Sequence, residues 1–130
     1  MNQTPPTDAQ SSSSTAREWL VTNGIGGYAS GVVDGANTRS YHGLLIAALH
    51  APIGRMVMWS HLFERVGSSE LELGEFRLEL GLPIWRFRSG EVEIERRIFL
   101  PYLQNTVIIT YRLIEGDRAT LELKPVLDFR

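Results

Sequence analysis

The sequence predicts an all-β protein, an antiparallel β-sandwich with a disordered N-terminal tail. Three observations lead to this prediction. After residue 17 the apolar residues recur mostly at every second position, which places them on one face of a strand rather than along a helical stripe. Turn-forming Gly, Asn, Asp and Ser residues separate these runs. The runs also follow one another at short spacing, as antiparallel strands of a sandwich do.

Composition limits both the size of the protein and its partners. The chain of 130 residues has room for one domain, and 43% hydrophobic with 22% charged residues is typical of a soluble globular protein. A net charge of -2 leaves no basic surplus, so we expect neither a nucleic-acid nor a membrane partner. The chain contains no cysteine and shows neither a signal peptide nor a long apolar run, which favours a cytoplasmic location.

The first segment, residues 1–16, consists mainly of Ser, Thr, Pro, Gln and Asn, with four consecutive serines at 11–14. Such a segment cannot bury enough apolar surface to offset the entropy lost on ordering. We therefore expect a disordered Ser/Pro-rich tail over 1–16 and one folded β-domain over 17–130.

Three strands are expected in the first half of this domain. Residues 41–49 form a compact apolar run with Gly43 near its start, and residues 70–80 form a second run interrupted by Gly74. Between them lies a segment whose apolar residues also fit helical spacing, namely Met56, Trp59, Phe63 and Val66. We favour a strand here, with a helix as the alternative.

The second half is predicted to be a meander that opens with a hairpin. Trp85 and Phe87 alternate with arginines, Ser89-Gly90 supplies a turn, and apolar residues then alternate with glutamates. Opposite charges can therefore pair on the solvent face. The charged residues concerned are Arg86, Arg88, Glu91, Glu93 and Glu95.

Two further strands complete the predicted meander. Residues 105–114 are apolar on both faces, which is typical of a central strand. The turn at 115–117 leads to alternating Leu121 and Leu123, and Pro125 disfavours a central position in the ladder.

Unusual residues concentrate between positions 23 and 43. Gly24, Gly26 and Ala29 match the loose dinucleotide pattern G-x-G-x-x-A, but that pattern requires a following helix, which Gly31 and Gly35 would interrupt. We interpret Gly24 and Gly26, together with Gly27, as a structural turn that needs positive φ and close backbone approach.

The second part of this cluster is the candidate substrate-binding site. Asn37, Arg39, Tyr41 and His42 combine planar hydrogen-bonding groups with an aromatic face, a mixture that suits sugar hydroxyls. Arg39 with Tyr41 or Trp19 would supply the required pairing of a polar group with a flat ring. The alternative is an internal hydrogen-bond network around Arg39.

Other chemistries find little support. The spacing of His42, His50 and His61 matches no local metal-ligand motif, and Ser30 lacks the first glycine of a nucleophile elbow. We therefore expect no metal and no cofactor.

Glycoside hydrolysis ordinarily uses two carboxylates that flank one bond, one of them held protonated by an apolar setting. Asp34 and Glu64 are the acidic residues nearest to apolar neighbours, and the glutamates at 91, 93 and 95 are expected on a solvated strand face. Spacing identifies no catalytic residue in this chain.

Long segments of the chain resemble one known family. The segments are E-W-L-V-T-N-G-I-G-G-Y-A-S-G at 18–31, N-T-R-S-Y-H-G-L-L at 37–45, P-I-G-R at 52–55, E-R-R-I-F at 95–99, Q-N-T at 104–106, and L-K-P with D-F-R between 123 and 130. In this order they resemble the opening of bacterial and archaeal glycogen-debranching enzymes, the amylo-alpha-1,6-glucosidase family of glycoside hydrolases.

The resemblance implies an N-terminal β-domain of supersandwich type that precedes an (α/α)6 barrel. Enzymes of this family hydrolyse α-1,6-linked glucose at glycogen branch stubs, and carboxylates of the barrel perform the chemistry. The segment between Val66 and Phe76 is shorter than the family implies, and Arg130 lies where the family's domain usually continues, so we expect an incomplete domain.

Three hypotheses for function follow. The first is a non-catalytic domain that packs against the catalytic barrel and helps to shape its site for α-glucan or glycogen. The second is a free-standing glucan-binding module. The third is a structural half-domain that needs a partner chain.

Overall fold

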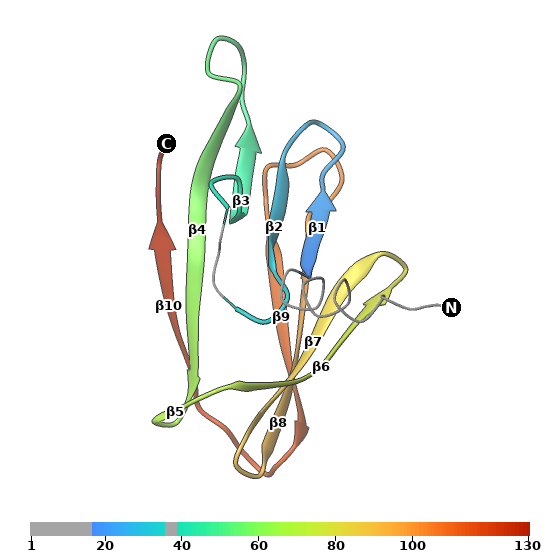
Figure 1. The fold of residues 1–130 in the computed structure, drawn as a ribbon, viewed down its shortest axis with the longest axis vertical. Coiled ribbons are helices and arrows are strands. Elements are labelled where there is room, and N and C mark those ends of the chain that lie inside the picture. The colour runs from blue at the N-terminus through green and yellow to red at the C-terminus, as the bar shows by residue number, and fades with distance from the viewer. Residues whose placement is uncertain (1–16, 36–38) are drawn as a thin grey trace, which may run out of the picture.

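The computed structural model describes residues 17–35 and 39–130, which form ten β-strands and no helix (Figure 1). The strands are β1 (Glu18–Thr22), β2 (Tyr28–Val32), β3 (Gly43–Ala48), β4 (Arg55–Val66), β5 (Ser69–Glu70), β6 (Glu72–Glu79), β7 (Leu82–Ser89), β8 (Val92–Phe99), β9 (Ile108–Glu115) and β10 (Leu121–Leu127). Every strand pair is antiparallel, so the predicted all-β class is confirmed. The predicted tail lies outside the described residues. No helix among the described residues could cross a membrane.

The strands form two sheets. The first sheet has the order β1-β2-β3-β4-β10, with β5 paired to the end of β4, and the second has the order β6-β7-β8-β9. Each sheet buries the apolar residues of one face, because alternating side chains of a strand point to opposite sides. The chain passes from the first sheet to the second between β5 and β6, and returns between β9 and β10 (Figure 1).

The core between the sheets is centred on two tryptophans. Trp85 of β7 is fully buried, and its ring meets Trp19 of β1 edge-to-face at 5.2 Å between centroids. The Trp85 indole N–H also donates to the main-chain oxygen of Val33 at 2.8 Å. A buried indole needs such an acceptor, so this bond ties the second sheet to the chain just after β2. The other buried members of the core are Val21, Ala29, Val33, Ile98 and Leu100.

The segment with two possible periodicities is a strand. Residues Arg55–Val66 form β4, which pairs with β3 on one side and with β10 on the other. The prediction of strand rather than helix is therefore confirmed.

Two predictions about the second half are wrong. The 105–114 region yields β9, which lies at the edge of its sheet and not in the centre. β10 does not continue the meander but crosses to the first sheet, where Leu123 lies opposite Glu64. Its apolar face thereby joins Trp59 and Leu62 of β4. The edge position predicted from Pro125 is confirmed.

The predicted β7–β8 hairpin is present, with Arg86 opposite Glu95 and Arg88 opposite Glu93. One expectation fails, because the side chain of Glu95 is only 2% exposed and does not lie on a solvated face. Flanking arginines cover it: Arg97 Nε donates to its Oε2 at 2.8 Å. Long arginine side chains can shield a strand residue from water in this way.

Candidate functional site

The hairpin of β1 and β2 builds the candidate site on its outward face. Strand alternation sends Trp19 and Val21 inward to the core and leaves Glu18, Leu20 and Thr22 on the outside. On the neighbouring strand, Tyr28 lies opposite Thr22, and Ser30 lies opposite Leu20. The outward side chains of both strands therefore form one surface.

The glycine-rich turn joins the two strands. Gly24 and Gly26 have φ values of 86° and 103°, which side chains rarely tolerate. A side chain at Gly24 would also overlap the ring of Tyr102, and a Cβ at Gly27 would lie 2.5 Å from Asn23 Nδ2. The turn thus excludes side chains for conformational and for steric reasons.

Asn23 holds this turn from within. Its fully buried side chain accepts N–H bonds from Ile25 at 3.1 Å and from Gly27 at 2.9 Å, and donates to the main-chain oxygen of Gln104 at 2.8 Å. Asn105 in turn exchanges two hydrogen bonds with the main chain of Ala48. Both asparagines therefore act as structural links between the turn, the 101–107 loop and β3.

Glu18 is the centre of the polar cluster. Its Oε2 accepts a bond from Arg39 Nε at 2.9 Å, and its Oε1 lies 2.8 Å from His42 Nε2 and 3.4 Å from the Tyr41 hydroxyl. The hydrogen bonds from His42 and Arg39 lower the pKa of the Glu18 carboxyl group. The carboxylate is therefore ionised at neutral pH, and three side chains of the 39–42 loop converge on it.

The hydrogen bonds of His42 define its tautomer. The main-chain N–H of Arg39 points at Nδ1, at 3.2 Å, so Nδ1 is an acceptor and the proton lies on Nε2. The Nε2–H group then donates to Glu18. The His42 side chain has no exposed surface, so it positions Glu18 and does not face solvent itself.

Tyr41 covers the surface from the loop side. Its main-chain oxygen accepts bonds from the hydroxyls of Tyr28, at 3.1 Å, and Ser30, at 3.4 Å, and its ring lies 5.9 Å from the Arg39 guanidinium carbon. The residue remains 48% exposed. These contacts fix the loop while leaving an aromatic ring in contact with water.

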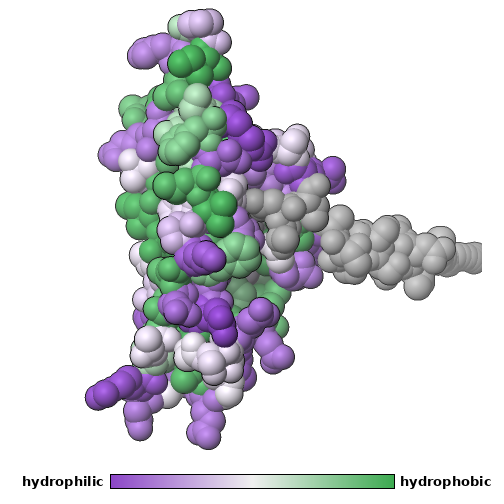
Figure 2. All heavy atoms as spheres, turned by 90° about the vertical axis from the view of Figure 1, so that its left-hand side faces the viewer, coloured by the Kyte–Doolittle hydropathy of each residue, from purple (hydrophilic) through white to green (hydrophobic). Residues whose placement is uncertain are grey.

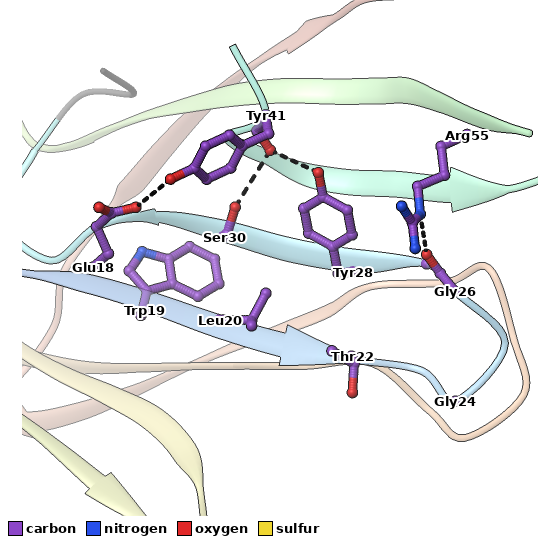
Figure 3. A pocket seen from close by; sticks show the side chains of 11 residues that line it. Glu18, Trp19, Leu20, Thr22, Gly24, Gly26, Tyr28, Ser30, Tyr41 and Arg55 are labelled. Carbon is purple, nitrogen blue, oxygen red and sulfur yellow. Dashed lines mark hydrogen bonds between the residues drawn. The ribbon is translucent and has the colours of Figure 1, made fainter. Parts of the chain in front are cut away.

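The outward face of the β1–β2 hairpin and Tyr41 line an open cleft of about 670 Å³ (Figure 3). At its other end Arg55 donates to the main-chain oxygen of Gly26 at 2.7 Å and lies 5.8 Å from the ring of Tyr28. The lining residues are Glu18, Trp19, Leu20, Thr22, Gly24, Gly26, Gly27, Tyr28, Ser30, Tyr41 and Arg55. The cleft thus offers the rings of Tyr28 and Tyr41 between an anionic and a cationic end.

Comparison with known families agrees with the resemblance noted in the sequence. The family model described as glycogen debranching enzyme N terminal matches residues 17–73 and 67–130, which together cover every residue after the predicted tail. The chain belongs to this family. No curated protein and no solved structure matches the chain. The two matches overlap at 67–73, where this domain passes from its first sheet to its second.

The four site residues predicted for this family member lie at different places relative to the cleft. Tyr41 lines the cleft, Arg39 flanks it through Glu18, and His42 lies buried behind Glu18. Asn37 lies outside the described residues. Trp19, the other ring considered beside Arg39, lines the cleft but is only 7% exposed, and it packs edge-to-face against Trp85.

The sequence alone did not single out Glu18, Tyr28 or Arg55 as site residues. Alternation along β1 is the signal that places Glu18 on the same face as Leu20. Its contact with Arg39 spans 21 positions of the chain, which no local motif reveals.

The residues of the chemistries that the sequence disfavours can also be located. The glycine motif is followed by β2 and not by a helix, so the context for dinucleotide binding is missing. Within the described part of the chain, no group of three or more His, Asp or Glu side chains could hold a metal ion. Ser30 sits within β2, where its hydroxyl bonds to the main chain of Tyr41.

Proposed function

We propose that this glycogen debranching enzyme N-terminal domain is non-catalytic and presents its β1–β2 cleft to α-glucan, beside an (α/α)6 catalytic barrel. The observation that carries this proposal is the exposed ring of Tyr41, held over β1 and β2 with its hydroxyl directed at Glu18 (Figure 3). A sugar offers apolar C–H faces and a rim of hydroxyls. An aromatic face next to an ionised carboxylate matches both features.

The electrostatics of the cleft support a binding role without hydrolysis. Glycosidases of the common type use two carboxylic groups, one of which must carry a proton. Glu18 is the one carboxylate among the described residues that line the cleft. Its lowered pKa and its bonds to His42 and Arg39 keep it ionised, which is unsuitable for a general acid.

The test is electrophoresis of the purified chain through native gels with and without glycogen. Binding predicts retardation in glycogen that is lost in Tyr41→Ala. This change removes the ring but keeps the main-chain oxygen that accepts bonds from Tyr28 and Ser30. Phe129→Ala is the matched control, because Phe129 is a 65% exposed aromatic residue that does not line the cleft.

Unchanged mobility of the folded protein in glycogen would contradict the binding role. It would favour a structural domain, a second candidate supported by the mutual bonds of Glu18, Arg39 and His42, which hold the 39–42 loop without a ligand. Release of glucose from a branched limit dextrin by the pure chain would contradict the non-catalytic assignment. A free-standing glucan-binding module also predicts retardation without a catalytic partner. Addition of a separate barrel domain distinguishes that module from a domain that acts beside a barrel, because only the latter should bind the barrel.

A further inference from the structure

Tyr102 is an exposed aromatic residue at one end of the cleft. It belongs to the loop between β8 and β9, which lies beside the β1–β2 turn (Figure 1). The residue is 75% exposed, yet its ring lies against Gly24, where a Cβ would be 2.4 Å from Cε1 of the ring. Gly24 lines the cleft at the end opposite Glu18 (Figure 3). The ring of Tyr102 therefore borders the cleft just beyond the residues that line it.

The loop that carries Tyr102 is fixed by the hairpin. The main-chain N–H of Gln104 donates to the oxygen of Pro101 at 3.3 Å, which closes a four-residue turn, and Leu103 has a φ of 64° at its third position. Glycine or asparagine usually occupies that position, because other side chains strain it. The N–H of Leu103 donates to the Asn23 oxygen at 2.6 Å, and the Asn23 side chain donates to the oxygen of Gln104. These bonds hold the strained turn, and with it the position of Tyr102.

The side chain of Tyr102 is not needed to hold this loop. Along residues 17–35 and 39–130, no side chain bonds to its hydroxyl or stacks on its ring. The loop is closed by main-chain groups and by Asn23, so a smaller residue at position 102 would leave these bonds in place. A tyrosine that is fixed on a rigid loop and left in contact with water is typical of binding surfaces, because its ring and its hydroxyl can both contact a ligand.

With Tyr102 included, three tyrosines follow the length of the hairpin. Tyr41 bonds to Glu18 at the start of β1, Tyr28 lies opposite Thr22 at its end, and Tyr102 lies beyond it against the turn. At about 3.3 Å per residue, the extended chain covers about 13 Å between Glu18 and Thr22 alone. That span is longer than one glucose ring. A glucan that contacts both ends of the hairpin must therefore do so with several of its glucose units.

We propose that Tyr102 is an additional glucan-binding residue, and that the cleft binds an extended segment of α-glucan rather than a single glucose unit. This inference rests on the proposed function, because Tyr41 and Glu18 hold one part of the same glucan chain. The C–H faces of successive glucose units lie on the tyrosine rings. The Tyr102 hydroxyl, which bonds to none of the described residues, exchanges a hydrogen bond with the sugar. Affinity therefore grows with chain length until the glucan reaches Tyr102.

The test compares maltose with maltoheptaose, each titrated into the full chain and followed by calorimetry. We expect the wild type to bind maltoheptaose more tightly than maltose. Tyr102→Ala should weaken maltoheptaose binding by about three- to tenfold, because one stacking ring is lost. It should leave maltose binding unchanged, because Tyr41 and Glu18 hold the shorter sugar. Tyr102→Phe keeps the ring and should retain most of the affinity for maltoheptaose.

Phe129→Ala is the matched control for the loss of an exposed aromatic ring. Phe129 is 65% exposed and follows β10, the strand on the side of the molecule where apolar side chains extend along much of the height (Figure 2). A glucan that adsorbs to exposed apolar surface in general would lose as much affinity in this variant as in Tyr102→Ala. We expect Phe129→Ala to bind both sugars as the wild type does.

Tyr102→Leu provides a second variant, because leucine keeps an apolar side chain next to Gly24 but lacks a flat ring. We expect it to fold, as judged by its thermal transition, and to lose the same affinity as Tyr102→Ala. Equal binding of maltoheptaose by Tyr102→Leu and the wild type, or equal affinity of the wild type for the two sugars, would overturn the inference while leaving the cleft as a glucan site. Failure of the wild type to bind either sugar would instead contradict the proposed function, and this inference with it.

Discussion

Glu18 shows how a single residue organises the cleft. It lies at the start of β1, yet its three side-chain partners all come from the 39–42 loop. Bonds from His42 and Arg39 satisfy both carboxylate oxygens and lower the pKa of the group. The Tyr41 hydroxyl also donates to Glu18, so the position of the aromatic ring depends on this carboxylate.

Replacement of His42 by alanine tests this organisation. The substitution removes a buried ring that links Glu18 to the main chain of Arg39. We expect the free energy of unfolding to fall by about 2–3 kcal/mol, because a buried hydrogen-bonded group is lost and a cavity remains. Urea denaturation measures this change.

His50→Ala is the matched control, since His50 is exposed, and it should change stability by less than about 0.5 kcal/mol. Equal stability of His42→Ala and the wild type would show that the bond between His42 and Glu18 does not hold the loop.

The β1–β2 hairpin is the element on which the cleft rests. Its turn combines positive φ at Gly24 and Gly26 with the buried side chain of Asn23, which bonds to the turn and to Gln104. The hairpin is therefore fixed both by its own turn and by the loop that precedes β9. A change in the turn should alter the shape of the cleft, because Gly24, Gly26 and Gly27 all line it.

Gly27→Ala is predicted to destabilise the domain. A Cβ at this position would lie 2.5 Å from Asn23 Nδ2 and 3.0 Å from both Asn105 Oδ1 and the Ile46 main-chain oxygen, so the network would have to shift. Overpacking of this kind costs about 1–3 kcal/mol, which thermal or urea unfolding detects.

The control for this change is Gly35→Ala, since a Cβ at Gly35 meets nothing within 4 Å. Gly35→Ala should not lose stability, because a Cβ there meets no atom and alanine lowers the entropy of the unfolded chain. A loss as large as in Gly27→Ala would show that the effect is not specific to the Asn23 network.

At the scale of the whole molecule, polar groups as well as apolar ones join the two sheets. Arg96 of β8 bonds to Glu64 of β4 at 2.5 Å and lies 4.1 Å from the ring centroid of Trp85. The Tyr111 hydroxyl of β9 donates to the other oxygen of Glu64. Burial, with the charge of Glu64, raises the pKa of Tyr111 far above its usual range, so the hydroxyl stays protonated and remains a donor.

Acid is expected to destabilise the domain. Burial alone would raise the pKa of Glu95, but the hydrogen bond and charge of Arg97 with the charges of Arg112 and Arg77 outweigh it, so the pKa is lowered. The pKa of Glu18 is lowered as well. In the unfolded chain both carboxyl groups take up protons near pH 4.5, before they do so in the folded state. Stability is therefore fully present above about pH 5 and falls as the pH drops through the lower folded pKa values.

Urea denaturation at a series of pH values from 7 to 3 measures this effect. Glu95→Gln should be less stable at pH 7 and show a shallower loss towards acid, because one of the two titrating groups is gone. Glu122→Gln, at an exposed position on β10, should keep the slope of the wild type. An unchanged slope in Glu95→Gln would refute the role assigned to its arginine partners.

Much of the fold was accessible from sequence because alternation is a local property. It correctly predicted the strand over 55–66, the β7–β8 hairpin and the edge position of Pro125. The site was accessible only in part. The residue types drew attention to Arg39, Tyr41 and His42, but the carboxylate that joins them lies on a distant strand, and such a contact has no local signature.

Residue order over short segments was enough to establish the β class, the antiparallel hairpins and the family. The departure of β10 from the meander, the edge position of β9 and the burial of Glu95 and His42 emerged only in the folded molecule. Sheet order and burial depend on which apolar faces meet across the sandwich. Alternation shows that a strand has an apolar face but not which other face covers it.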